Sequence, residues 1–168
     1  STPIATDCNS PVSVSLVSGP ASGTTFPLGA STITFRATDS CGNTADCSFV
    51  ITVVDSDIPS VQCPSNAVNA CAGTTCTWTS DASIAPIYND NCAGSTISYV
   101  ISGATTVGTT TGSAVGTVFN LGISTVTYTV TNNGLSASCS FQVVVSDCTP
   151  PTITCPADLV LECADPDI

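Results

Sequence analysis

The sequence contains no histidine and no lysine, and Arg36 is its only basic residue. Twelve acidic residues stand against it, so the formal net charge is −11. Phosphate groups and anionic membrane surfaces are bound through Lys and Arg, so this balance excludes nucleic acid and anionic membranes as partners. Without His or Lys, a Ser or Cys nucleophile also lacks its usual base, and no motif marks a pair of glycosidase carboxylates. We therefore expect no enzymatic activity.

Long apolar runs and helical periods are also missing. No run approaches the roughly 20 apolar residues of a membrane helix, so we expect no membrane insertion. No secretory signal peptide is visible, and we interpret the chain as a mature protein or a fragment of one. The sequence also has no Asn-x-Ser/Thr acceptor, which argues against N-linked glycans, whereas its many Ser and Thr residues offer sites for O-glycosylation.

Cysteine is abundant instead, with 11 residues in a chain of 168. A zinc site without histidine would need clustered cysteines, usually as close CxxC pairs, and the sequence has no such pair. The cysteines therefore predict disulfides, and disulfides predict an oxidising, extracellular compartment.

Alternating apolar and polar residues are the main structural signal. Residues 12–17, 32–37 and 47–54 alternate, and turns rich in Gly, Pro, Asn and Asp separate them. Short strands of this kind, at about ten-residue spacing, indicate an all-β fold of sandwich type. Residues 55–59 break the pattern with charge and proline, so we place a module boundary there. Further strands are predicted at residues 60–71, 74–80, 95–102, 105–111, 124–131 and 137–146.

An internal repeat relates the two parts of the chain. Residues 23–35 match residues 116–128, and residues 47–54 match residues 139–146. Residues 150–163 repeat the opening of the second part, since Cys155 matches Cys63 at an offset of 92. Such repeats predict a tandem array. We divide the chain into an incomplete module (1–57), a complete module (58–148) and a final segment (149–168).

Several motifs resemble the hyalin repeat (HYR) family of extracellular immunoglobulin-like modules. They are I-x-C-P at a module start, a T-D-C or N-D-N-C segment, F-P-x-G before a T-I-T-F strand, A-T-D-x-x-G-N, and C-S-F in the last strand. The second module departs from the pattern, because residues 131–134 read TNNG in place of an acidic loop. The resemblance implies two β-sandwich modules with adhesive or scaffolding roles and no catalysis.

The resemblance also implies an order of strands that the first module lacks. In the family the I-x-C-P strand comes first, and its cysteine bridges the C-S-F strand. Cys63 and Cys139 satisfy this in the second module, whereas Cys47 has only Cys155 as a candidate. We expect the segment after residue 149 to act as a donor strand that completes the first module of another copy. Its donor residues are Thr152, Ile153, Thr154, Cys155, Leu159, Val160 and Leu161.

Three arrangements could give this order. The segment could fold back within one chain, insert into the next subunit of a polymer, or belong to one period of a longer continuous repeat. A fold-back must cross a whole module, roughly 35–40 Å long, through the few connecting residues 146–151, which favours the forward arrangements.

Cysteine spacing extends the disulfide prediction. Cys63 and Cys71 lie on one predicted strand, Cys139 lies on another, and Cys148 follows the end of that second strand. Parallel pairing of these two strands would allow a Cys71–Cys148 bridge beside Cys63–Cys139, and each bridge would stabilise the fold by about 4 kcal/mol. We further expect Cys76–Cys92, Cys8–Cys41 and an inter-subunit Cys47–Cys155 bridge, which leaves Cys163 without an assigned partner.

Acidic residues near the predicted turns and module boundaries are candidate calcium ligands, because Ca²⁺ prefers oxygen ligands. They are Asp55, Asp57, Asp147, Asp7, Asp39 and Asp90. The alternative is that they form turns and keep the chain soluble. Arg36 lies within a predicted strand, and we expect it to pair with a nearby carboxylate.

The sequence thus predicts a structural subunit of an extracellular filament or adhesive fibre. Its main partners would be copies of itself, joined head to tail by donor-strand complementation and an inter-subunit disulfide. Matrix components and surface glycans are further candidate partners. The alternative is a pair of binding or spacer modules within a large secreted adhesin or enzyme.

Overall fold

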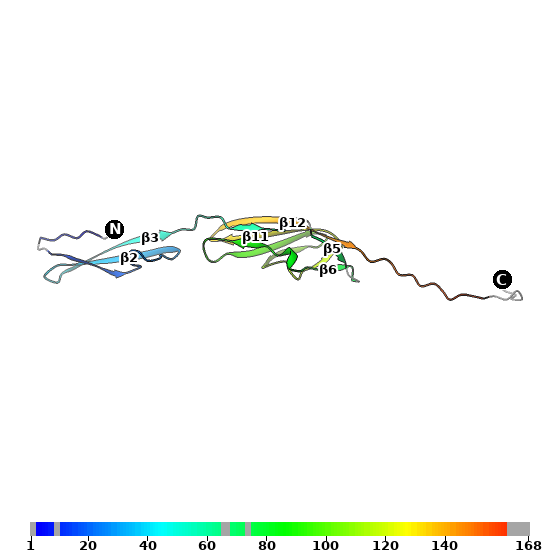
Figure 1. The fold of residues 1–168 in the computed structure, drawn as a ribbon. Helices are drawn as coiled ribbons and strands as arrows, with labels where there is room; N and C mark the ends of the chain where they lie inside the picture. The colour runs from blue at the N-terminus through cyan, green and yellow to red at the C-terminus, as the bar shows by residue number, and fades with distance from the viewer. Residues whose placement is uncertain (1–2, 9–10, 65–67, 73–74, 161–168) are drawn as a thin grey trace. The chain divides into compact units, whose positions relative to one another are not determined.

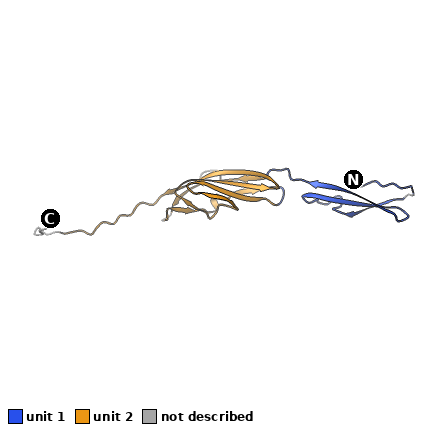
Figure 2. Ribbon diagram, turned by 180° about the vertical axis from the view of Figure 1, so that it is seen from behind, with its two compact units in different colours: residues 1–58, 91–93 blue, residues 59–90, 94–168 orange. Residues whose placement is uncertain are grey.

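The computed structural model describes residues 3–8, 11–64, 68–72 and 75–160, and in these ranges the fold is all-β. The chain forms two compact units (Figure 2). Unit 1 contains residues 1–58 and 91–93, and unit 2 contains residues 59–90 and 94–168. The division falls where the sequence predicts a boundary, although the short segment 91–93 groups with unit 1.

Unit 1 is a single antiparallel sheet (Figure 1). Its strands are β1 (Ser13–Ser18), β2 (Gly29–Thr38) and β3 (Thr44–Val53), in the order β1-β2-β3. The β2–β3 turn is held by Asp39, whose carboxylate accepts hydrogen bonds from the backbone N–H groups of Cys41 and Asn43, both at 2.8 Å. An Asp side chain that bonds the following backbone in this way is a common turn former.

Unit 2 is built around a five-stranded sheet in the order β5-β12-β11-β8-β9. Its strands are β5 (Val68–Ala72), β8 (Thr96–Gly103), β9 (Val107–Thr111), β11 (Gly122–Asn132) and β12 (Leu135–Asp147). A two-residue turn joins β11 to β12, and both of its residues, Asn133 and Gly134, have positive φ. An Asn-Gly pair is the preferred sequence for such a hairpin, because both positions require the left-handed region. Strand β5 pairs with β12 in parallel, whereas the other pairings are antiparallel.

Shorter elements complete unit 2. Strand β4 (Ser60–Gln62) pairs with β7 (Ile87–Asn89), and β6 (Thr77–Thr79) pairs with β10 (Val118–Asn120). A 3-10 turn, η1 (Ala82–Ile84), contributes the fully buried Ile84. The core lies between these elements and the inner face of the large sheet, with Phe119, Val126, Tyr128, Val130 and Val143 at its centre.

The structure corrects several predicted strands. Residues 60–71 do not form one strand, because β4 ends at Gln62 and β5 begins at Val68. Of the predicted strand 74–80, residue 74 lies outside the described residues, and among residues 75–80 only Thr77–Thr79 are a strand. Strands β7 and β10 were not predicted at all, since three residues are too few to show an alternating pattern. The long strands were predicted to within about five residues at their ends.

Candidate functional site: the open face of unit 1

The inner face of the unit 1 sheet is exposed, although its sequence is that of a core. We call this surface the open face and define it by Ile33, Phe35 and Ala37 of β2 and Cys47, Phe49 and Ile51 of β3. Phe35 and Phe49 stack on it with ring centroids 6.4 Å apart. Phe49 is 43% exposed, and of the six side chains only Ile33 is buried. An apolar sheet face left in this state is one that another element would cover.

Two hollows lie along the open face. One has a volume of about 340 Å³ and is lined by Phe26, Ile33, Phe35, Phe49 and Ile51 with residues of the preceding loop. The other has a volume of about 270 Å³ and is lined by Ile4, Val14, Phe35, Ala37 and Cys47, among others. Phe35 lines both hollows, so they follow one another along the same sheet.

The corresponding face of unit 2 is closed. By the internal repeat, Phe49 corresponds to Phe141 and Ile51 to Val143, which are 7% and 0% exposed. Part of the cover comes from the start of the module, and the fully buried Ile84, Ala114 and Phe119 supply the rest. Val61, Cys63, Val68 and Trp78 pack against the core, and Trp78 lies 5.8 Å from Phe119 between ring centroids. Both faces are apolar at the aligned positions, so the difference in exposure comes mainly from what covers them.

The covering segment is also bonded to the sheet covalently. Cys63 forms a disulfide with Cys139 of β12, and Cys71 of β5 forms a second one with Cys148. Both are the pairings predicted from the sequence. The Cα atoms of Cys63 and Cys139 lie 5.8 Å apart, and residues 68–72 run parallel to β12 between the two bridges. The segment that starts with V-x-C-P, at residues 61–64, thus closes the sandwich of unit 2.

The second copy of this segment is exposed. Residues 151–160 form no strand, and Ile153 and Val160 are 90% and 87% exposed. Of the predicted donor residues, Thr152, Ile153, Thr154, Cys155, Leu159 and Val160 all lie in this exposed stretch, and Leu161 lies outside the described residues.

The other predicted disulfides are not formed in the single chain. Cys8 and Cys76 are exposed free thiols, so the predicted Cys8–Cys41 and Cys76–Cys92 bridges are wrong. Cys47 and Cys155 are also exposed free thiols in this single chain, which leaves the inter-subunit bridge between them a prediction. Cys163 lies outside the described residues.

The predicted calcium ligands lie at turns and strand ends, where most of them accept hydrogen bonds. Asp39 also accepts a bond from the Asn43 side chain, which together with the backbone bonds lowers the pKa of its carboxyl. Asp147 accepts bonds from the backbone and side chain of Thr149, which lower its pKa too. Asp7 is exposed and lines a hollow of about 200 Å³ that Asp39 also lines.

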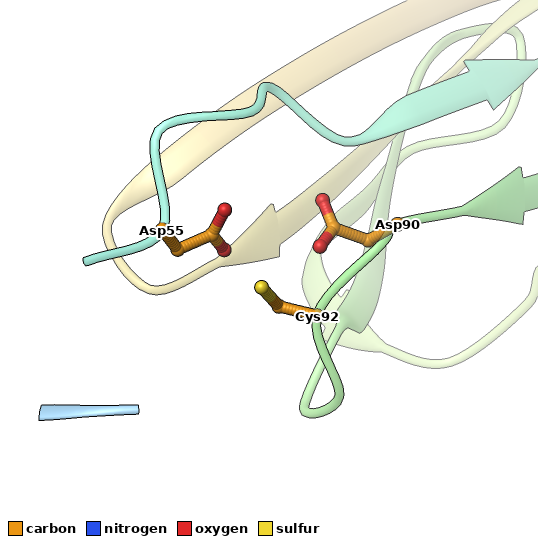
Figure 3. A group of neighbouring side chains, drawn as sticks. All are labelled: Asp55, Asp90 and Cys92. Atoms are coloured by element: carbon orange, nitrogen blue, oxygen red, sulfur yellow. The ribbon is translucent and has the colours of Figure 1, made fainter. Parts of the chain in front are cut away.

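The other three candidate calcium ligands also accept hydrogen bonds. In unit 1, Asp57 accepts a bond from Asn91 at 2.6 Å, and Asp55 accepts one from the backbone of Asp57. In unit 2, Asp90 accepts a bond of 2.7 Å from Asn132. Figure 3 draws Asp55 and Asp90 with Cys92, which is counted with unit 1. Calcium binding by these residues stays a prediction.

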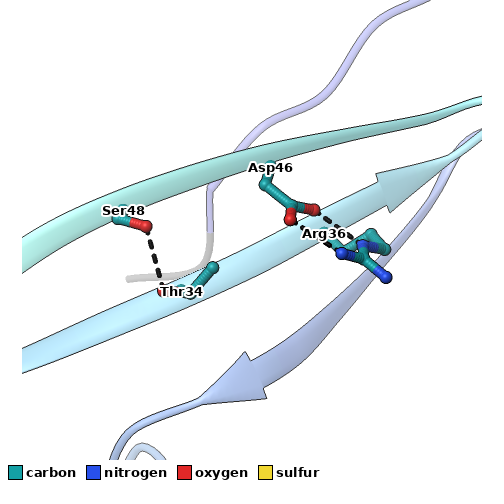
Figure 4. A network of polar contacts seen from close by, with 4 residues as sticks. All are labelled: Thr34, Arg36, Asp46 and Ser48. Carbon is teal, nitrogen blue, oxygen red and sulfur yellow. Dashed lines mark hydrogen bonds and ion pairs between the residues drawn. The ribbon is translucent and has the colours of Figure 1, made fainter.

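Arg36 pairs with Asp46, as expected for the only base in an acidic chain. Its guanidinium donates two parallel bonds to that carboxylate, at 2.7 and 2.8 Å (Figure 4). These bonds raise the pKa of Arg36 and lower the pKa of Asp46. The pair faces away from the open face, because Arg36 and Phe35 are neighbours on one strand.

Of the residues that form the open face, only Cys47 was named from the sequence, as the partner proposed for Cys155. Phe35 and Phe49 were missed. The repeat offered a signal for them, since they align with Tyr128 and Phe141 at positions that alternate inward with a bridged cysteine.

Comparison with known proteins gives a family and one curated relative. Residues 1–53 match the model of the HYR domain. Over 145 residues, or 82% of the chain, the sequence is 37% identical to hyalin of Strongylocentrotus purpuratus. The match covers 11% of that protein, so the chain spans about a tenth of the length of its relative.

Solved structures give more distant matches. Drosophila N-cadherin EC1-3 aligns at 17% identity with a TM-score of 0.37, over 84% of this chain and 57% of the other. An endo-fucoidan hydrolase of glycoside hydrolase family 107 aligns at 14% identity with a TM-score of 0.29, over 82% and 24% of the two chains. Among the described residues, no helix is long and apolar enough to cross a membrane.

Proposed function

We propose that this chain, which belongs to the HYR domain family, is an extracellular structural subunit that joins copies of itself head to tail. In this proposal, residues 152–160 of one copy cover the open face of unit 1 in the next. The proposal assigns the chain a binding and scaffolding role and no catalysis. The two disulfides of unit 2 support an oxidising compartment outside the cell.

The observation that carries the proposal is the difference between two equivalent phenylalanines. Phe141 is buried in a core against which the chain's own V-x-C-P segment packs, whereas Phe49 is 43% exposed. Leaving an aromatic face in water forfeits about 25 cal/mol for each Å² of apolar surface that a cover would bury. A second copy of this segment, which reads I-x-C-P, is present in the same chain at residues 153–156.

The internal repeat supplies a register for the contact. Val68 pairs with Val143 in unit 2, so the repeat places Val160 opposite Ile51. In the same way, Ile153 takes the place of Val61, and Cys155 takes the place of Cys63 beside Cys47. Strand addition of this type provides backbone hydrogen bonds for affinity and side-chain pockets for specificity.

The free energies of apolar burial and of chain ordering indicate that the contact needs a disulfide. Burying Ile153, Leu159 and Val160 would contribute roughly 1.5–3 kcal/mol each. Ordering some ten backbone residues would cost roughly 1–2 kcal/mol each. The apolar contacts alone therefore fall short, and the strand hydrogen bonds and a Cys47–Cys155 disulfide are needed to hold the segment. A contact of this kind joins two different surfaces and does not close on itself, so it builds a filament.

Gels and microscopy of the full chain test this proposal. We expect regular fibres in negative stain and a covalent ladder on non-reducing gels that collapses to monomer with thiol. Substituting Cys155→Ser or Cys47→Ser should abolish the ladder, whereas Cys76→Ser, which changes another exposed free thiol, should leave it intact. Monomer only, with both thiols free in oxidised material, would refute the proposal.

A second candidate function is a pair of spacer modules within a long secreted polypeptide. The observation in its favour is that a tenth of hyalin already matches most of this chain. In that case the same strand exchange would link successive repeats of one polypeptide. A ladder or a large species that survives reduction would favour this second function.

A further inference from the structure

The outer face of the large sheet in unit 2 carries hydroxyl groups and no charge. We call it the hydroxyl face and define it as the outward side chains of β8, β11 and β12. Thr125, Thr127 and Thr129 form its central row on β11. Ser138 and Ser140 flank this row on β12, and Ser98 flanks it on β8. Of the twelve side chains in register across all three strands, all but Val100 and Gln142 carry hydroxyls, and the apolar pair Ile123 and Val144 lies at one end of the same face.

Many of these hydroxyls already have partners within the face. Thr129 shares a hydrogen bond of 3.0 Å with Ser138, Thr96 shares one of 2.8 Å with Thr131, and Ser98 donates to the Thr129 carbonyl at 3.4 Å. A polar group that keeps its hydrogen bond costs much less to remove from water than one that loses it. The threonine methyl groups, Val100, Ile123 and Val144 then add apolar surface. The face is therefore suited to dry contact with another flat surface.

The charge distribution indicates what that other surface is. The formal charge of the chain is −11, so two copies repel each other wherever their acids meet. Strands β8 and β11 have no acidic residue, and β12 has only Asp147 at its end. The other described acids of unit 2, Asp81, Asp90 and Asp158, lie outside the strands. The hydroxyl face is thus a surface at which two copies meet without apposing like charges.

We propose that the hydroxyl face is a lateral contact between two copies of this chain, packed face to face. Two sheets in such contact lie about 10 Å apart, and a contact between identical patches is twofold symmetric. From ordinary strand spacing, three strands of eight residues bury roughly 800 Å² in total. This is below the roughly 1,000 Å² of a stable interface, so a single pair associates weakly. Within a filament many such contacts would act together and bundle neighbouring filaments.

Sedimentation equilibrium of the full chain tests this contact. The background variant carries Ile153→Asp, which blocks the proposed end-to-end contact, so the result does not depend on the proposed function. We expect weak self-association that strengthens with added NaCl, because salt screens the remaining acids. Thr127→Asp brings carboxylates together across the twofold contact and should weaken association at least tenfold.

Matched variants separate the contact from general charge effects. Thr106→Asp adds the same charge at the exposed turn before β9 and should change the dissociation constant less than twofold. Thr127→Val keeps the shape and should retain association. Ser140→Asp, on an exposed position of the same face, repeats the test if the thermal midpoint shows that Thr127→Asp is misfolded. A background protein that stays monomeric at millimolar concentration, or equal weakening by Thr127→Asp and Thr106→Asp, would overturn the proposal.

Discussion

Tyr128 connects the two layers of unit 2 through its buried hydroxyl. This group donates to the Ile84 carbonyl at 2.9 Å and accepts from the Ala114 backbone N–H at 3.0 Å. All three residues are fully buried. The equivalent residue in unit 1 is Phe35, which has no such hydroxyl. A single oxygen thus holds η1 and the loop before β10 against the sheet.

Substituting Tyr128→Phe should lower the free energy of unfolding by about 1–3 kcal/mol, because two buried backbone groups lose their partner. Urea denaturation followed by tryptophan fluorescence measures this change. Tyr88→Phe, at a partly exposed tyrosine of β7, is the control and should cost less than about 0.5 kcal/mol. Equal effects of the two substitutions would contradict this role.

The Arg36–Asp46 pair predicts a pH dependence of unit 1. The guanidinium holds the pKa of Asp46 below its usual range. A carboxyl whose pKa is lower in the folded state stabilises the fold above its ordinary pKa and loses that contribution as the pH falls. Wild type should therefore be more stable than Asp46→Asn at neutral pH, and the difference should vanish between about pH 4 and pH 2. Both side chains are exposed, so we expect the difference to be small.

Thermal unfolding of the two proteins across this pH range gives the test, and added salt should reduce the difference at neutral pH. A difference that is unchanged at about pH 2 would show that the ion pair is not its source.

The two disulfides join the same pair of segments, so their contributions are not independent. Cys63–Cys139 alone would close a loop of 76 residues. With Cys71–Cys148 in place, however, the remaining loop runs through only the few residues that separate the two bridges on each strand. The chain-entropy model gives about 3 kcal/mol for a loop of some 15 residues.

We therefore predict that Cys63→Ser with Cys139→Ser lowers the free energy of unfolding by about 3 kcal/mol, and that removing both bridges costs distinctly more than twice this amount. Chemical denaturation of the double and quadruple variants measures the two costs. If the quadruple variant loses only twice the free energy that the double variant loses, the two bridges act on separate loops.

In the exposed segment after β12, we predict that an added charge weakens end-to-end association at alternate residues only. By the repeat, Ile153 matches the inward Val61 and Thr154 matches the exposed Gln62. Ile153→Asp should abolish end-to-end association, because it would bury a carboxylate against Phe35 and Phe49. Thr154→Asp adds the same charge one residue later and should leave association within a few-fold. Light scattering under oxidising conditions distinguishes the two, and equal effects would rule out the assigned register.

The long strands of unit 2 were predictable because residues 122–132 and 135–147 alternate over many positions. The Cys63–Cys139 disulfide was implied by the resemblance to the HYR family, and the matching cysteine spacings on the two segments then indicated Cys71–Cys148. The elements that close the sandwich were not predictable. Strands β7 and β10 and the turn at Ile84 are too short for a period, and tertiary contacts decide their conformation.

The wrong cysteine pairs show the same limit. Cys8 and Cys76 were paired with Cys41 and Cys92 by elimination and not by strand register. Cys76 lies before β6 with a positive φ, in a local conformation that composition does not indicate. Where two strands fix the relative position of two cysteines, the sequence predicts the bridge, and elsewhere a count of cysteines does not.

At the scale of the whole molecule, the two units have similar sequences but different degrees of closure. Unit 2 contains both a sheet and the segment that covers it, whereas unit 1 presents an open sheet, and the chain carries a second, exposed copy of the covering segment at residues 152–160. The match to the HYR domain and the match to hyalin suggest an extracellular, adhesion-type module. On this account the repeat, and not the single chain, is the unit in which every sandwich is complete.

Isotope-resolved disulfide mapping tests this account most directly. Light and ¹⁵N-labelled full chains are mixed after reduction, allowed to oxidise, and digested without reduction. The account predicts peptides that join Cys47 to Cys155, with mixed light–heavy pairs in the proportion expected for random partners. Pairs of a single label only would place the bridge within one chain, and alkylated Cys47 and Cys155 without any bridge would contradict the account altogether.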